Sequence, residues 1–189
     1  MTKIILLNGP SGSGKDTLAD AIEDYRTKKI KFAEPLRRLV IAALNLDNTD
    51  QAGIWLEHNK NVPNDSLMGM TPREYMIWMS EKCYKPRFGK AVFGRIAVDR
   101  IRVFDSIYDI FTVSDSGFDS EAQVLVDEFG SNNIMLVHLH RDGCTFMNDS
   151  RSYIELDHVR QVDIFNDFSI DIAVKSLNLH VKAWLNDTD

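Results

Sequence analysis

The sequence predicts an α/β fold in which a five-stranded parallel sheet is flanked by helices. Short apolar runs recur along the chain with amphipathic helical patterns between them, which is the order expected of parallel strands joined by crossover helices. The first run, at 4–7, breaks into a glycine-rich turn before a helical pattern. The run at 134–139 is almost continuously apolar, as expected of a strand that is covered on both faces.

The first part of the chain is predicted to supply two of the strands, at 3–8 and 29–32. A helix is expected at 15–27 between them. Pro35 presets the first turn of a second helix, which we expect to run to about residue 46. The stretch 45–70 is polar and rich in asparagine, and it is therefore expected to be irregular.

The clearest helix start in the sequence is at Thr71. Glu74 stands three residues later, which is the spacing of a capping box, in which each side chain bonds the backbone N–H of the other residue. The helix is predicted over 71–84. Pro86 and Gly89 are expected to end it before another helix begins.

The remaining part of the chain continues the alternation of strands and helices. The apolar face of one helix ends at Gly130, and Ser169 is placed to cap the last helix. The elements expected here are a helix at 90–104, a strand at 107–114, a helix up to 129, strands at 134–139 and 161–165, and a final helix after 169.

The segment GPSGSGKDT at 9–17 is predicted to bind phosphate groups, because it lies between a buried strand and a helix. Its glycines allow backbone N–H groups to point inward, and the helix that follows adds the positive end of its dipole. Lys15 supplies a cation for the outer phosphates. The alternative is an ordinary glycine turn.

Two carboxylates are candidate ligands for Mg²⁺. The common form of this motif ends in Lys followed by Ser or Thr, whose hydroxyl binds the metal, but here Asp16 takes that place and Thr17 follows. A carboxylate is also a hard oxygen ligand. Asp115 ends a predicted strand and is the second candidate, the alternative being a cap for the next helix. His138 and His140 share one side of a strand, and without a third ligand we interpret them as packing residues.

Four features are predicted to lie at one edge of the sheet, because each follows the end of a strand. They are the glycine-rich segment, Asp115, Arg141 and Asn166. In parallel sheets, ligands bind beyond the carboxyl ends of the strands. This edge is therefore the predicted site.

Composition limits the classes of protein that remain. The 189 residues suit one domain, and the net charge of −6 argues against a general nucleic-acid binder. Two cysteines, Cys83 and Cys144, fit a reduced, cytoplasmic protein. No signal peptide is expected before the first strand, and no apolar stretch approaches the ~20 residues needed to cross a bilayer. We expect no nucleic-acid or membrane partner, and the sequence leaves open whether the protein forms a homodimer.

Several segments resemble one family of kinases over nearly the whole chain except 45–70. The segments are GPSGSGKDT at 9–17, FAEPLRR at 32–38, TPREYMIWMSEKCYKPRFGKAVFGRIAVDRI at 71–101, VSDSGFDSEAQ at 113–123, HRDGCTFMNDSRSYIE at 140–155 and FND at 165–167. In their order and residues, these segments are similar to those of the deoxynucleoside monophosphate kinases encoded by bacteriophages, which belong to the broader nucleoside monophosphate kinase group.

The resemblance implies a P-loop kinase fold in a single domain, with a helical acceptor-binding region at about 34–104 and a short lid at about 141–151. It implies Mg²⁺-dependent transfer of the γ-phosphoryl group of ATP to a deoxynucleoside monophosphate, in the host cytoplasm if the protein is phage-encoded. The residues that would act in catalysis are Lys15, Asp115, Arg141 and Arg151. Those that would bind ATP are Gly9, Ser11, Gly12, Ser13, Gly14, Lys15, Asp16, Thr17 and Asn166. Those that would bind the acceptor are Phe32, Arg37, Arg73, Arg87 and Arg95.

The chain departs from the family pattern at two positions. Many relatives carry an arginine two residues after the strand-end aspartate, where this chain has Gly117, and Asp142 replaces a frequent proline after the lid arginine. Two other functions are therefore kept beside the first. One is a small-molecule kinase of the same fold with a non-nucleotide acceptor, and the other is a nucleotide-binding sensor or inhibitor without turnover.

Overall fold

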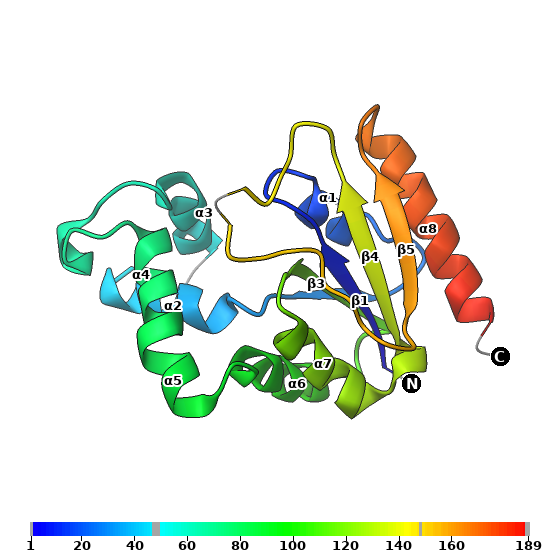
Figure 1. Ribbon diagram of the computed structural model, residues 1–189, viewed down its shortest axis with the longest axis horizontal. Coiled ribbons are helices and arrows are strands. Elements are labelled where there is room, and N and C mark those ends of the chain that lie inside the picture. Colours follow the sequence, from blue (N-terminus) through cyan, green and yellow to red (C-terminus); the bar gives the residue numbers. More distant parts are fainter. Residues whose placement is uncertain (1, 47–49, 148, 188–189) are drawn as a thin grey trace. The chain divides into compact units, whose positions relative to one another are not determined.

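The computed structural model contains a five-stranded sheet in which every strand is parallel to its neighbours (Figure 1). The strand order is β2-β3-β1-β4-β5, so the predicted five-stranded parallel sheet is confirmed. β1 lies at the centre, and all six of its residues are buried. The strands are β1 (Lys3–Asn8), β2 (Thr27–Ile30), β3 (Ile110–Ser116), β4 (Ile134–His140) and β5 (Arg160–Phe165).

The described residues are 2–46, 50–147 and 149–187, so the predicted irregular stretch 45–70 and the predicted lid 141–151 each include positions outside them. The chain divides into two units, Met1–Phe32 with Gly94–Asp189, and Ala33–Phe93. The first unit holds the sheet, and the second is helical.

One face of the sheet packs against the first and last helices. These are α1 (Lys15–Asp20) and α8 (Ile170–Asn186), and α8 runs along β5 at the edge of the sheet (Figure 1). The residues that form this core are Ile5, Leu7, Leu18, Ala19, Ile22, Ile110, Met135, Val137, Leu139, Val162, Ile164, Ala173, Leu177, Val181 and Trp184. The predicted cap of α8 is confirmed, because the Ser169 hydroxyl accepts a hydrogen bond from the backbone N–H of Asp171.

The alternate residues of the strands face the other side of the sheet, where α7 (Asp119–Phe129) contacts β4. A single 3₁₀ turn, η3 (Ser131–Asn133), joins these two elements after Gly130 ends the helix as predicted. α6 (Val92–Phe104) approaches α7 closely, since Gly94 lies against the backbone of Glu121.

The first helix is much shorter than predicted. We expected it to reach residue 27, but α1 ends at Asp20. The carbonyl of Ala21 accepts a hydrogen bond from the Asn178 side chain of α8, which replaces a further turn of helix. β2 also begins at Thr27, two residues before its predicted start, so the chain must turn earlier.

The second unit consists of helices. They are α2 (Glu34–Ala43), α3 (Asp50–Asn59), the 3₁₀ turn η1 (Asp65–Leu67), α4 (Pro72–Trp78), the π-helix η2 (Met79–Tyr84) and α5 (Lys85–Phe88). The expectation that 45–70 is irregular was therefore wrong for α3. Ala52 and Leu56 of α3 are spaced by one helical turn and pack against Val40 and Ile41 of α2, but the polar residues around them and Gly53 inside the helix weaken this signal in the sequence.

The capping box at the start of α4 is confirmed. The Thr71 hydroxyl accepts from the N–H of Glu74 at 3.1 Å, and the Glu74 carboxylate accepts from the N–H of Thr71 at 2.8 Å. The expected break at Pro86 was wrong, because the chain stays helical to Phe88. The preceding turn is a π-helix, whose wider backbone accommodates a proline ring, and Gly89 with a φ of 85° ends the helix.

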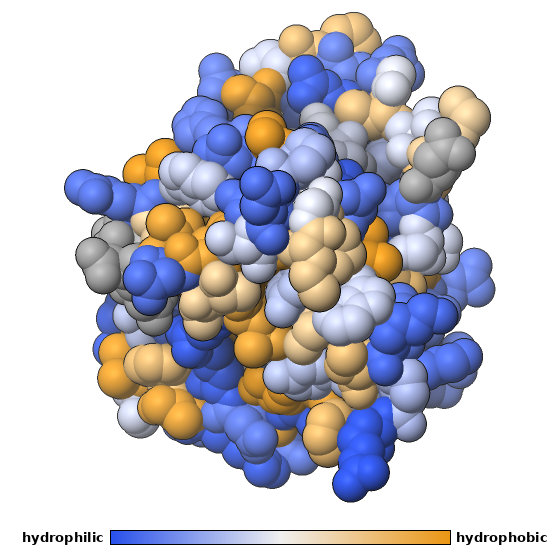
Figure 2. All heavy atoms as spheres, turned by 90° about the vertical axis from the view of Figure 1, so that its left-hand side faces the viewer, coloured by the Kyte–Doolittle hydropathy of each residue, from blue (hydrophilic) through white to orange (hydrophobic). Residues whose placement is uncertain are grey.

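Figure 2 faces the side of α3 and α4 in Figure 1 and shows apolar side chains scattered among polar ones. The exposed large apolar residues of the second unit are Ile54, Val62, Met68, Ile77, Trp78 and Phe88. Among the described residues, no helix combines the length and the apolar character that a membrane span requires.

The close packing of α6 on α7 gives a prediction about stability. A Cβ added at Gly94 would lie 2.4 Å from the carbonyl oxygen of Glu121, a backbone atom that cannot rotate away. Gly94→Ala is therefore expected to lower the free energy of unfolding by about 1–3 kcal/mol, as measured by urea denaturation.

Gly53→Ala is the matched control, because an added Cβ there meets no described atom within 4 Å beyond its neighbours. Since Gly53 lies inside α3, the control is expected to leave stability unchanged or to raise it by up to about 1 kcal/mol. Equal effects of the two substitutions would contradict the packing described here.

Candidate functional site

The turn between β1 and α1, residues 9–14, is referred to as the glycine-rich loop. Gly12 and Gly14 have φ values of 82° and 105°, which residues with a Cβ rarely adopt. The Ser13 hydroxyl donates a hydrogen bond to the Pro10 carbonyl at 2.9 Å across the turn. The loop is thus a tight turn whose shape depends on its glycines.

Lys15 is folded back into the glycine-rich loop. Its ammonium donates to the carbonyl oxygens of Gly9 and Pro10 at 2.7 and 2.6 Å, and the residue is only 9 % exposed. Burial, and then the positive charge of Arg151, lower the pKa of Lys15 from 10.5 to about 8. The side chain remains mostly protonated at pH 7, so it is a buried cation whose hydrogen-bond partners among the described residues are two backbone carbonyls and, more weakly, the Ser13 hydroxyl.

Asn166, which follows β5, supports the loop from beneath. Its side-chain amide donates to the Ser13 carbonyl at 2.8 Å and is buried. Asn166, predicted to bind ATP, therefore uses its amide nitrogen to hold the loop. Ser11 and Thr17, also predicted to bind ATP, are exposed.

Asp16 is surrounded by partners that the sequence analysis missed. It accepts hydrogen bonds from the Ser114 hydroxyl at 2.7 Å and the Lys31 ammonium at 2.9 Å, and Lys29 lies 3.7 Å away. Partial burial raises the pKa of Asp16, but the hydrogen bonds from Lys31 and Ser114 outweigh it and hold the pKa below its ordinary value. The carboxylate is therefore ionised and 58 % exposed, as a metal ligand must be, although a metal would compete there with a lysine.

Asp115 lies at the end of β3, at the same edge of the sheet. Its carboxylate accepts from the backbone N–H of Phe32 at 2.9 Å, and its negative charge acts on both Lys15 and Arg151. The alternative role as a helix cap is not observed, since Phe118 occupies the N-cap position of α7. The Phe32 side chain, predicted to contact the acceptor, is 3 % exposed.

The two arginines of the segment between β4 and β5 both reach this edge, in different ways. Arg141 is exposed and donates one hydrogen bond to the Gly12 carbonyl at 2.9 Å. Arg151 is half-buried, and its guanidinium pairs with Asp149 through Nε at 2.9 Å and through Nη2. This pairing with Asp149, together with its charge, outweighs burial and raises the pKa of Arg151, so the group stays charged.

A buried asparagine, also missed from the sequence, ties the end of this segment to the sheet. The Asn8 amide donates to the carbonyls of Ser116 and Ser152 at 2.9 and 3.0 Å, and its oxygen accepts from the N–H of Ile154 at 2.9 Å. An asparagine at the end of a buried apolar strand is the one signal for it in the sequence, because every polar group buried there needs a partner.

The predicted shared edge therefore holds for the first unit. The structure brings together the glycine-rich loop, Arg141 and Asn166 by direct hydrogen bonds, and the Arg151 side chain lies against Gly117, two residues after Asp115. His138 and His140 bond the Ile154 carbonyl and the Asp163 carboxylate. Within the described residues, no group of three or more His, Cys, Asp or Glu side chains could hold a metal ion.

The basic residues predicted to bind the acceptor lie in both units. Arg37 on α2 pairs with Glu57 of α3 at 2.6 Å. Arg73 on α4 and Arg87 on α5 are exposed, and all three belong to the second unit. Arg95 is exposed on α6 in the first unit.

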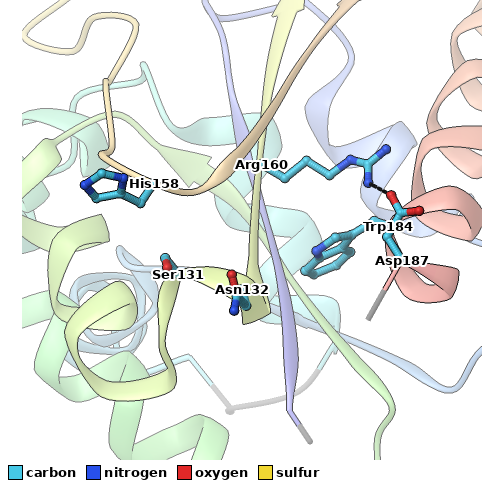
Figure 3. A pocket seen from close by; sticks show the side chains of 6 residues that line it. All are labelled: Ser131, Asn132, His158, Arg160, Trp184 and Asp187. Atoms are coloured by element: carbon cyan, nitrogen blue, oxygen red, sulfur yellow. Dashed lines mark hydrogen bonds and ion pairs between the residues drawn. The ribbon is translucent and has the colours of Figure 1, made fainter. Parts of the chain in front are cut away.

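A pocket of about 520 Å³ lies at the amino ends of the strands, at the other end of the sheet from the glycine-rich loop (Figure 3). The residues that line it are Ser131, Asn132, His158, Arg160, Trp184 and Asp187. They stand at the amino ends of β4 and β5 and at the end of α8, and Arg160 is paired with Asp187 at 2.6 Å. This pocket contains none of the predicted site residues.

Comparison with known proteins supports the fold. The chain is similar to a solved structure of a sugar kinase from Janibacter sp. HTCC2649, described as unliganded, with a TM-score of 0.51 and 12 % identity over 98 % of this chain and 95 % of that one. No family model matches the chain, and no curated protein matches it. At this identity the likeness concerns the arrangement of strands and helices alone.

Proposed function

We propose that the protein is a phosphotransferase that uses ATP and Mg²⁺. The observation that carries the proposal is the buried ammonium of Lys15 inside the glycine-rich loop, with Arg141 and Arg151 at the same edge of the sheet. Phosphoryl transfer needs positioning and neutralisation of charge more than covalent help from the protein. The similarity of the fold to a sugar kinase supports the same class of reaction.

The chain's own groups have separate roles in this proposal. The glycine-rich loop and Lys15 bind the β- and γ-phosphates of ATP, with the ammonium exchanging two carbonyl partners for phosphate oxygens. Arg141 and Arg151 neutralise the charge that develops on the transferred group, because a guanidinium binds phosphate oxygens in pairs. Asp16 and Asp115 fit an oxygen-liganded metal, and they would hold Mg²⁺, which supplies further positive charge at the phosphates.

We further propose that the acceptor is a deoxynucleoside monophosphate. The resemblance of the segments at 32–38, 71–101 and 140–155 to the phage kinases supports this assignment. The arginines that would bind the acceptor phosphate are Arg37, Arg73, Arg87 and Arg95, and Phe32 would contribute to the acceptor side. Products would be the nucleoside diphosphate and ADP.

Binding of ATP tests the first part of this proposal directly. Titration calorimetry with a non-hydrolysable ATP analogue should give saturable binding to the wild-type protein, which is strengthened by Mg²⁺. Arg160→Ala, which changes the pocket at the other end of the sheet, should bind the analogue as the wild type does. If Arg160→Ala loses binding while Lys15→Ala binds normally, the nucleotide binds in the pocket beside Arg160, and the proposal is wrong.

The charge of Asp16 is expected to set the requirement for Mg²⁺. Asp16→Asn keeps the size of the side chain and removes its charge, so the Mg²⁺ concentration that gives half-maximal activity should rise several-fold. Asp16→Ser, which restores the common form of the motif, should bring it back toward the wild-type value. The measurement is activity against Mg²⁺ concentration, and superimposable curves for the wild type and Asp16→Asn would remove Asp16 from the metal site.

A further inference from the structure

The side chain of Arg151 passes directly over Gly117. A Cβ built on Gly117 would lie 2.6 Å from both Cγ and Cδ of Arg151 and 2.8 Å from its Cβ. The backbone of Gly117 is outside the left-handed region, so its conformation does not itself require glycine. The three described atoms nearest to the added Cβ all belong to Arg151, so the close approach of this side chain requires a glycine here.

Hydrogen bonds to Asn8 fix this close approach. The buried Asn8 amide binds the carbonyl of Ser116 at 2.9 Å and the carbonyl of Ser152 at 3.0 Å. Ser116 precedes Gly117 in the chain, and Ser152 follows Arg151. One amide group thus holds the two backbone segments side by side, and the Arg151 side chain crosses over Gly117 between them.

The crossing brings the guanidinium of Arg151 close to the charged groups of the candidate site. Its positive charge acts on Lys15, and the charges of Asp115 and Asp149 act on it. The side chain is 26 % exposed and is held by Asp149. The Arg151 guanidinium is therefore held by Asp149, whereas Arg141 is exposed.

We propose that Gly117 is a positioning residue, whose missing side chain leaves room for the Arg151 side chain at the carboxyl end of β3. The consequence for phosphoryl transfer rests on the proposed function, in which Arg151 and Lys15 both act on the transferred phosphoryl group. A larger residue at position 117 would displace Arg151 without removing it. Gly117 is therefore expected to control the rate of transfer, although it carries no chemical group of its own.

The first test is a double-mutant cycle with Gly117→Ala and Arg151→Ala. Each single substitution should lower kcat at least about tenfold, with a smaller change in the KM for ATP. In the Arg151→Ala background, Gly117→Ala should have almost no further effect, because the side chain that it displaces is already absent. Gly53→Ala, a glycine with free space around it, should leave kcat unchanged. Losses that simply multiply in the double variant would overturn the proposal.

The second test needs no substrate and therefore separates this proposal from the proposed function. The Arg151 Nε–H donates to Asp149 at 2.9 Å, and its NMR signal should exchange faster with water in Gly117→Ala than in the wild type, because the added Cβ displaces the side chain. An unchanged Arg151 signal in Gly117→Ala would contradict the positioning role, even if transfer were slower. If no turnover of ATP with any acceptor is found but the Arg151 signal changes, the proposed function fails and the positioning of Arg151 stands.

Whether Gly117→Ala folds, alone and together with Arg151→Ala, is also informative. If Gly117→Ala alone fails to fold while the double variant folds, the clash is with the Arg151 side chain, and the proposal is supported. If Gly117→Ala unfolds the protein in both backgrounds, the glycine serves the backbone and not Arg151, and the proposal is wrong.

Discussion

Replacing Lys15 by alanine is expected to lower the rate of phosphoryl transfer by about a hundredfold or more, while the fold remains intact. The hydrogen-bond partners of the buried ammonium are neutral oxygens, two backbone carbonyls and the Ser13 hydroxyl, so its removal breaks no ion pair. What is lost is a preorganised positive charge beside the phosphates. The measurement is ADP formation by the variant, with circular dichroism as the check on folding.

Lys175→Ala is the control, because this lysine is exposed on α8 and should leave the rate unchanged. Near-normal kinetics in folded Lys15→Ala would remove the glycine-rich loop from catalysis.

Because the pKa of Lys15 is lowered, both the activity and the stability of the protein should depend on pH near this value. The ammonium loses its proton as the pH rises through about 8, so kcat/KM, which reports the free enzyme, should fall there in the wild type and not in Lys15→Ala. Between about pH 8 and the ordinary value of 10.5, the unfolded chain binds the proton and the folded protein does not. The contribution of Lys15 to the free energy of unfolding should therefore increase with pH over this interval.

Removing Arg141 or Arg151 is expected to lower kcat by about tenfold to a hundredfold, and to weaken ATP binding much less. Both guanidinium groups are placed to stabilise charge that develops during transfer. If the two arginines only contacted bound ATP, their removal would instead raise the KM for ATP and leave kcat unchanged. Steady-state kinetics of the two alanine variants distinguish these outcomes.

The two arginines should differ in how they respond to substrates. Arg141 lies in an exposed part of the segment, whereas the chain after Arg151 is tied to Asn8. Binding of a two-substrate mimic should therefore increase hydrogen-exchange protection around Arg141 far more than at 152–154, as a closing segment that excludes water would. Unchanged protection around Arg141, with a defect only in ATP affinity, would refute the predicted lid.

The sequence predicted the parts of the structure that depend on local patterns. The sheet follows from apolar runs such as Ile4 to Leu7, and the start of α4 from the spacing of Thr71 and Glu74. Boundaries were less accurate where a distant residue decides them. α1 ends early because Asn178 binds the carbonyl of Ala21, a contact between residues far apart in the chain.

The same distinction applies to the candidate site. The glycine-rich loop and its lysine are recognisable because their residues are contiguous. Lys31, Asp149 and Asn8 could not be assigned from the sequence, because their roles depend on strands and segments that meet only in the folded protein. The role of Gly117 likewise depends on the position of the Arg151 side chain, which the sequence does not show.

The proposed transfer to a deoxynucleoside monophosphate is tested by a panel of acceptors incubated with ATP and Mg²⁺ and assayed for ADP and for the phosphorylated product. The panel contains the deoxynucleoside monophosphates, the corresponding ribonucleotides, simple sugars and a sample without acceptor. We expect ADP release coupled to formation of a deoxynucleoside diphosphate, with little release when no acceptor is present. Phosphorylation of a sugar instead, or tight ATP binding without turnover on any acceptor, would contradict the proposed transfer.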